Sequence, residues 1–157
     1  MKGKTNVMRI LDAAKIPYEV MEYEVDENNL AATHIAKEIG LLPEMVFKTL
    51  VALGDKSGPV VFCIPADLEI DLKKAAKVTG NKRLEMVAVK ELLALTGYIR
   101  GGCSPIGMKK KFPTYFSHFC AMQEKITISA GVRGAQLLLN TKALVGFVGA
   151  VLEDITA

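Results

Sequence analysis

Apolar positions recur at helical spacing in five short segments of the chain. In the first, Val7, Ile10, Leu11 and Ala14 follow the i, i+3, i+4, i+7 order that places side chains on one face of a helix. The same spacing predicts helices over residues 7–14, 35–39, 72–78, 90–95 and 141–147. Their predicted N-caps are Thr5 or Asn6, Thr33 and Asp71, and their predicted ends are Pro17, Gly40, Gly80 and Gly97.

Runs rich in β-branched and aromatic residues lie between these helices and are typical of strands. They predict strands over residues 18–25, 46–53, 60–64, 82–87, 115–120, 126–130 and 151–155. Residues 54–58 are the expected hairpin turn between the second and third of these, and residues 115–120 are expected to pair with 126–130. No βαβ rhythm is present. The pattern therefore predicts an α+β fold, a single domain whose mixed, largely antiparallel, curved (barrel-like) sheet is flanked by short helices.

Composition narrows the possible functions. The chain has 157 residues, 50% hydrophobic and 24% charged, so we expect one domain over residues 1–157 with a substantial core. Lys plus Arg is 20 and Asp plus Glu is 17, a net charge of +3 that permits a polyanionic partner without demanding one. The absence of Trp argues against an aromatic platform for single strands. Three Cys in no paired spacing argue against a disulfide scaffold or a zinc ribbon.

The sequence contains no recognisable targeting or membrane segment. Residues 7–12 are amphipathic rather than uniformly apolar, unlike a signal peptide. The longest apolar runs fall far short of the ~20 residues that a membrane helix needs. We therefore expect a soluble, cytoplasmic protein with neither a membrane nor DNA as its partner.

Common catalytic and metal-binding motifs are missing. His34 and His118 stand in no metal-ligand spacing, and the sequence has no GxSxG, GxxxxGK[ST] or GxGxxG motif, so we expect no metal and no cofactor. Cys103, in the Gly- and Pro-rich loop 101–107, is the natural choice for a protein nucleophile. Cys63 and Cys120 fall in strand-like runs and are expected in the core.

Three features remain as candidates for chemistry. Lys48 interrupts an apolar strand, so it either reaches the strand edge or enters a polar pocket. The glycines and proline of loop 101–107 form either an anion-binding or oxyanion-binding loop or a purely structural turn. The run Lys109–Lys111 follows directly, and is either a solvated surface or a set of phosphate contacts.

Seven fragments of the chain form one ordered pattern, at residues 16–18, Tyr23, 47–50, 72–77, 97–98, 101–110 and 129–134. Taken together, they resemble the YbaK/prolyl-tRNA editing-domain family, in its bacterial Cys-tRNA(Pro) deacylase branch. The resemblance covers nearly the whole chain, and the order and spacing of the fragments are more specific than any one of them.

The resemblance implies an aminoacyl-tRNA editing fold that hydrolyses the ester of mischarged Cys-tRNA(Pro), and possible action on Cys-tRNA(Cys) is left open. Its partners would be tRNA and, as a source of tRNA identity, prolyl-tRNA synthetase. Lys48, Tyr23 and Gly102 match the family's catalytic positions. The implied substrate-binding positions are Phe47, Thr49, Ser104, Pro105, Gly107, Ser129, Gly131 and Arg133, and Lys109, Lys110 and Lys111 are the expected tRNA contacts.

The resemblance also bears on the nucleophile. The family loop tends to carry an aliphatic residue where this chain has Cys103, which weakens Cys103 as the attacking group. The family instead implies attack by the thiol of the substrate cysteine, with tRNA hydroxyls assisting. Attack by a bound water is the alternative. Two other functions stay open, a non-catalytic module that binds aminoacyl-tRNA or a synthetase, and a hydrolase of small aminoacyl or thiol esters.

Overall fold

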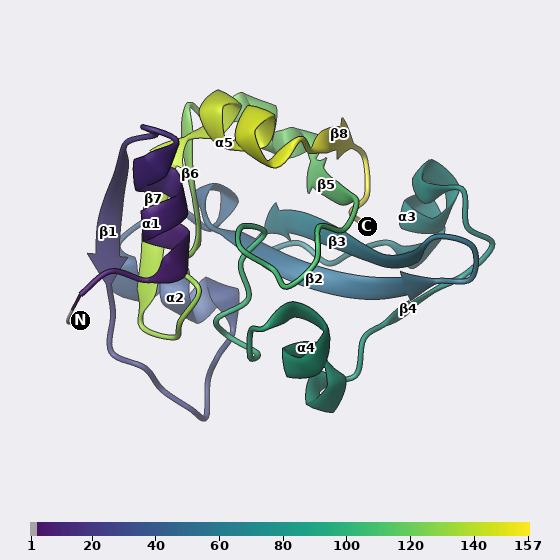
Figure 1. The fold of residues 1–157 in the computed structure, drawn as a ribbon, viewed down its shortest axis with the longest axis horizontal. Helices are drawn as coiled ribbons and strands as arrows, with labels where there is room; N and C mark the ends of the chain where they lie inside the picture. The colour runs from purple at the N-terminus through teal and green to yellow at the C-terminus, as the bar shows by residue number, and fades with distance from the viewer. Residues whose placement is uncertain (1–2) are drawn as a thin grey trace.

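The computed structural model describes residues 3–157 and contains helices and strands in an α+β arrangement (Figure 1). The α-helices are α1 (Asn6–Ala13), α2 (Ala32–Ile39), α3 (Leu72–Thr79), α4 (Val89–Thr96) and α5 (Thr141–Val148), and η1 (Pro43–Met45) and η2 (His118–Met122) are 3₁₀ turns. The strands are β1 (Tyr18–Glu22), β2 (Phe47–Gly54), β3 (Gly58–Pro65), β4 (Leu84–Met86), β5 (Thr114–Ser117), β6 (Lys125–Ser129), β7 (Ala135–Asn140) and β8 (Val151–Glu153). No helix within residues 3–157 has the length and apolar character to cross a bilayer.

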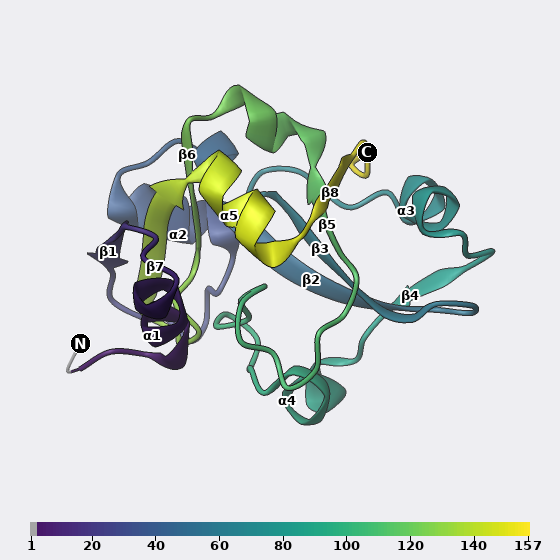
Figure 2. The same cartoon turned by 45° about the horizontal axis from the view of Figure 1, so that its top comes forward.

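The strands form two sheets. One has the order β1-β7-β6 and is antiparallel, and the other has the order β4-β2-β3-β5-β8. In the second sheet β2 pairs antiparallel with β3 and β4, whereas β5 pairs parallel with both β3 and β8. A single parallel bridge, Val46 to Thr127, connects the two sheets where β2 begins. Helix α5 runs from the first sheet to β8 of the second (Figure 2).

The main core lies where the two sheets and α1 meet. Helix α1 buries Val7, Met8 and Leu11 in the same cluster as residues of β6 and β7, and Phe47 of β2 stacks on Phe116 of β5 in that cluster. A second core fills the space between the β2–β3 hairpin and α3, which presents Ala75 and Ala76 to it. Burial of one face of each element against these cores positions β2, the strand that carries Lys48.

The predicted fold class and most helix boundaries are confirmed. Thr5 caps α1 by accepting from the Met8 amide, Asp71 caps α3 by accepting from the amides of Lys73 and Lys74, and left-handed glycines end α2, α3 and α4. The strands are mixed and largely antiparallel as expected, but they divide between two sheets instead of closing into a barrel.

Two local predictions are wrong. Thr33 lies inside α2, and Ala31, which has no capping side chain, occupies the N-cap position. Residues 115–120 do not pair with 126–130, because the first segment is β5 followed by the 3₁₀ turn η2, while β6 pairs with β7. The strands predicted at 18–25, 82–87 and 151–155 are present but shorter, and they correspond to β1, β4 and β8.

The outer end of the β2–β3 hairpin is fastened by one buried amide. The Oδ1 atom of Asn81 accepts hydrogen bonds from the amides of Lys56 and Ser57, both at 2.9 Å. Its Nδ2 atom donates to the hydroxyls of Ser57 and Thr79, at 2.9 and 2.8 Å. One side chain therefore ties the hairpin turn to the end of α3. It accepts two hydrogen bonds at Oδ1 and donates both hydrogens of Nδ2, which is its full hydrogen-bonding capacity.

We expect Asn81→Ala to lower the free energy of unfolding by about 2 kcal/mol, since it removes four hydrogen bonds but leaves the exposed turn amides accessible to water. Urea denaturation followed by circular dichroism measures this change. Asn28→Ala is the matched control, because Asn28 is exposed and its side chain makes no hydrogen bond within residues 3–157. Equal stability of the two variants would contradict the anchoring role of Asn81.

Candidate functional site

A cavity of about 450 Å³ opens beside the inner end of β2. Its walls come mainly from five parts of the chain, which are residues 30–35 at the start of α2, strand β2 with Val46 before it, residues 66–69, the segment 86–92 leading into α4, and the loop at 100–103. Ser129 of β6 and Gln136 of β7 also line it. The lining is mostly apolar with a few polar and charged groups, which is typical of a small-molecule site.

Lys48 lies on the wall of this cavity and is the one charged residue of β2. Its side chain is 23% exposed, and its Nζ atom donates to the carbonyl oxygen of Ala66 at 3.2 Å. The same Nζ atom lies 3.9 Å from Oε1 of Glu69, whose side chain is 86% exposed. Lys48 therefore enters the pocket, and its ammonium group is oriented by the segment that follows β3.

Phe47 and Thr49, the neighbours of Lys48, also line the cavity. The Phe47 side chain is buried against Phe116, so its backbone and ring fix the start of β2. The Thr49 hydroxyl lies 3.6 Å from the Cys63 sulfur across the hairpin. The packing of Phe47 and the contact of Thr49 across the hairpin thus hold Lys48 in register with the cavity.

The loop 101–107 faces the cavity with its first residues, since Gly101 and Cys103 line the wall. The Gly102 amide is directed elsewhere and donates to the Ile99 carbonyl oxygen at 3.0 Å. Neither Gly101 nor Cys103 donates an amide hydrogen bond to any residue in the range 3–157. These two N–H groups therefore have no hydrogen-bond partner within residues 3–157.

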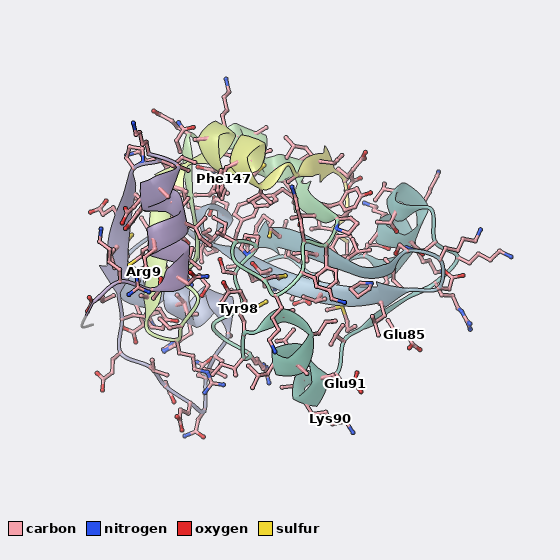
Figure 3. The ribbon with its side chains drawn as sticks, in the orientation of Figure 1. Arg9, Glu85, Lys90, Glu91, Tyr98 and Phe147 are labelled. Atoms are coloured by element: carbon pink, nitrogen blue, oxygen red, sulfur yellow. The ribbon has the colours of Figure 1, made fainter. Side chains whose placement is uncertain are left out.

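Close backbone packing fixes the shape of this loop. A Cβ atom at Gly102 would lie 3.1 Å from the carbonyl carbon of Val132, and one at Gly107, where φ is +79°, would lie 2.8 Å from the Tyr98 hydroxyl. Tyr98, labelled in Figure 3, donates that hydroxyl to the Ile106 carbonyl oxygen. Ser104 is fully buried and accepts from the Ile106 amide at 3.3 Å. Gly102, Ser104 and Gly107 therefore shape the loop and do not line the cavity.

The second half of the loop faces a different cavity, of about 270 Å³. Pro105, Gly107, Lys110 and Lys111 line it together with apolar residues of α1 and α5, including Phe147 (Figure 3). Lys109 lines neither cavity, and its Nζ atom donates to the Ala94 carbonyl oxygen at 3.4 Å near the end of α4. Of the predicted residues of this loop and the lysine run, Pro105, Gly107, Lys110 and Lys111 thus face the second cavity, and Gly102, Ser104 and Lys109 line neither.

The remaining predicted residues lie on the turn 129–134 and beside it. The Ser129 hydroxyl accepts from the Gly131 amide at 3.1 Å, and Gly131 has a φ of +93° and packs against Val7 and Tyr98. The Arg133 Nε atom donates to the Arg100 carbonyl oxygen at 2.8 Å. The Tyr23 amide donates to the Gly134 carbonyl oxygen at 3.0 Å, but Tyr23 does not line the cavity.

Sequence reasoning missed five polar residues of the cavity, which are Thr33, Asp67, Glu69, Arg100 and Gln136. Gln136 is 4% exposed and accepts a hydrogen bond from the Thr127 hydroxyl at 3.0 Å. A single polar residue inside the apolar run of β7 was a signal of the same kind as Lys48 in β2. No three of the His, Cys, Asp and Glu residues within 3–157 lie together in a group that could hold a metal ion.

Cys103 lines the cavity, yet its surroundings keep the thiol protonated. The side chain is 8% exposed, and burial raises the pKa of the Cys103 thiol to about 12. The hydrogen bond with Thr96 lowers the pKa but does not offset the burial. Burial also raises the pKa of the Cys120 thiol to about 11 and raises that of Cys63 further. A nucleophilic cysteine needs the opposite shift, so Cys103 is a poor nucleophile near neutral pH.

Comparison with known proteins gives consistent matches. Residues 26–147 match the family described as the aminoacyl-tRNA editing domain. A protein of Enterococcus faecalis named as a candidate Cys-tRNA(Pro)/Cys-tRNA(Cys) deacylase, EbsC, is 47% identical over 153 residues, which is 98% of this chain and 93% of that protein. A proline–tRNA ligase of Thermodesulfovibrio yellowstonii is 29% identical over 93 residues, 59% of this chain but 15% of the ligase.

A solved structure shares the fold. The crystal structure of a candidate trans-editing enzyme for prolyl-tRNA synthetase superposes with a TM-score of 0.83 at 23% identity and covers 99% of both chains.

In the native protein we expect iodoacetamide to alkylate Cys103 more than tenfold more slowly at pH 8 than it alkylates the unfolded chain, because a pKa of about 12 leaves very little thiolate. The rate should keep rising with pH through pH 10, since the thiol is still mostly protonated there. Peptide mass spectrometry of quenched samples gives the rate at each cysteine, and urea-unfolded protein is the control. A rate at Cys103 that levels off near pH 7 would reveal an activated thiolate and contradict this assignment.

Proposed function

Because this chain belongs to the aminoacyl-tRNA editing domain family, we propose that it is a trans-editing hydrolase that deacylates mischarged Cys-tRNA(Pro), with Cys-tRNA(Cys) as a second substrate. The observation that carries the proposal is the position of Lys48, a cation in an otherwise apolar strand that lies on the wall of the largely apolar cavity. The name of the 47% identical E. faecalis relative supports the choice of cysteine as the amino acid.

The cavity offers the groups that ester hydrolysis requires. Hydrolysis passes through a tetrahedral intermediate whose oxygen becomes negatively charged, and hydrogen-bond donors already in position stabilise that charge. The Gly101 and Cys103 amides, which are unbonded within residues 3–157, supply donors from the loop wall. Lys48 supplies a positive charge from the β2 wall, where Ala66 and Glu69 hold its ammonium group.

The other predicted site residues have supporting roles in this proposal. Gly102, Ser104 and Gly107 maintain the loop, and Ser129 and Thr49 present hydroxyls to the bound aminoacyl group. Tyr23 would act through the turn that contains Gly134, to which its amide is bonded. We assign Lys110 and Lys111, at the second cavity, to the phosphates of the acceptor stem.

The proposed nucleophile belongs to the substrate. Cys103 is the cysteine that lines the cavity, and the raised pKa of its thiol makes it a poor nucleophile at neutral pH. Attack by the substrate thiol on its own carbonyl carbon forms a carbon–sulfur bond and breaks the bond to the ribose oxygen, which takes up a proton. The product is a four-membered thiolactone that water then opens to free cysteine. Closing such a strained ring demands tight positioning, which the apolar walls provide.

The proposal includes a partner. The proline–tRNA ligase that matches over 93 residues carries a similar segment within a much longer chain, which supports a functional relationship with prolyl-tRNA synthetase. We propose that a synthetase of this kind provides tRNA identity, since the chain carries a net charge of only +3.

We expect Lys48→Ala to reduce the first-order rate of Cys-tRNA(Pro) deacylation by two to three orders of magnitude, about 3–4 kcal/mol, because it removes one charged donor to the developing oxyanion. The fold should survive, since Lys48 is partly exposed. Single-turnover deacylation with radiolabelled cysteine measures the rate. Lys56→Ala, at the other end of the same hairpin, is the control and should match the wild type. A folded Lys48→Ala protein with normal turnover would remove the basis of the proposal.

A second expectation separates the substrate thiol from the alternatives. Wild-type protein should deacylate Ser-tRNA(Pro) at least about a hundredfold more slowly than Cys-tRNA(Pro), since a hydroxyl is a much weaker nucleophile than a thiol near neutral pH. Cys103→Ser should keep most of the activity on Cys-tRNA(Pro). Similar rates on the two esters would indicate attack by water, and an acyl-enzyme trapped on Cys103 would indicate a covalent thiol hydrolase.

A further inference from the structure

Arg100 is a cation of the main cavity whose side chain has no partner among residues 3–157. The charged residues that line this cavity are Lys48, Asp67, Glu69 and Arg100. Lys48 already contacts the Ala66 carbonyl oxygen and Glu69. The guanidinium group of Arg100 is exposed and forms neither an ion pair nor a hydrogen bond with any residue in the range 3–157.

The backbone that carries Arg100 is held firmly. The Arg133 Nε atom donates to the Arg100 carbonyl oxygen at 2.8 Å, and the Gly102 amide donates to the Ile99 carbonyl oxygen at 3.0 Å. Gly101, with a φ of +87°, makes the turn between these two bonds, and a Cβ atom there would lie 3.3 Å from the Arg133 Nε atom. The Arg133 side chain thus holds the Arg100 backbone, and its guanidinium has no carboxylate partner among the described residues.

The two charged walls of the cavity differ in sign. The segment around Lys48 combines one cation with the carboxylates of Asp67 and Glu69, a formal charge of −1. The charged residue of the loop wall is Arg100, a formal charge of +1. An anionic group of the substrate is therefore favoured at the loop wall and disfavoured beside residues 67–69. Guanidinium groups match phosphate oxygens in geometry as well as in charge.

We propose that Arg100, positioned by Arg133, binds the 5′-phosphate of the terminal adenosine to which the amino acid is esterified. This proposal rests on the proposed function and specifies which end of the substrate faces which wall. The phosphate lies at the loop wall, so the aminoacyl ester extends from there toward Lys48. Arg100 is then a specificity-determining residue, because it distinguishes a nucleotide ester from a simple amino-acid ester.

Binding of two non-hydrolysable analogues tests the proposal without relying on catalysis. The analogues carry cysteine in amide linkage to 3′-amino-3′-deoxyadenosine, one with a 5′-phosphate and one without, and calorimetry gives their dissociation constants. Wild-type protein should bind the phosphorylated analogue about tenfold or more tightly than the other. Arg100→Ala should remove this difference by weakening only the phosphorylated analogue, and Arg100→Lys should restore part of it. Arg9→Ala is the matched control, because Arg9 is an exposed arginine on α1 that lines neither cavity (Figure 3).

A preference for the phosphate that persists in Arg100→Ala, or the absence of any preference in the wild type, would overturn the proposal. With Cys-tRNA(Pro) as substrate, Arg100→Ala should raise KM and leave kcat close to that of the wild type. Failure of the proposed function would have a different signature, since the wild type would then not deacylate Cys-tRNA(Pro) at all. A free mononucleotide is the alternative source of the same phosphate chemistry, and adenosine 5′-phosphate binding as tightly as the phosphorylated analogue would identify it and overturn the assignment.

Discussion

At Gly102 the loop backbone passes so close to residue 132 that even a methyl side chain would lie 3.1 Å from a backbone carbon. This contact brings together two parts of the chain that belong to different halves of the fold, the loop after α4 and the turn between β6 and β7. Arg133, one residue further along the turn, then bonds to the Arg100 carbonyl oxygen. The cavity has its present shape because no side chain separates these two backbones.

The opposite wall depends on a longer-range constraint. β2 is paired along its whole length with β3, and Ala66, which follows β3, accepts the hydrogen bond from Lys48. The single bridge from Val46 to Thr127 sets where this hairpin meets the other sheet. The groups that line the cavity are therefore supplied by regular structure on one side and by irregular backbone on the other, an arrangement in which a rigid scaffold positions the loops.

The features that the sequence predicted well are those with local causes. Asp71 caps a helix through its own nearby amides, and Gly80 ends the same helix because a left-handed residue is needed there. The partner of β5 could not be predicted in this way, because its neighbours β3 and β8 lie far away in the chain, on either side of it. Lys48 was recognisable as a charge within an apolar strand, but Arg100, Asp67 and Glu69 resemble ordinary surface residues until the fold places them at one cavity.

The division of labour within the loop has a consequence for how related sequences are interpreted. Gly102, Ser104 and Gly107 satisfy packing and backbone requirements of the loop itself and do not line the main cavity. Under the proposed role of Lys48, a descendant that lost this lysine would still need the three residues and would keep the loop signature while binding its ligand without hydrolysing it. In a genome survey the loop would therefore indicate the architecture, and the strand lysine is the proposed marker of activity.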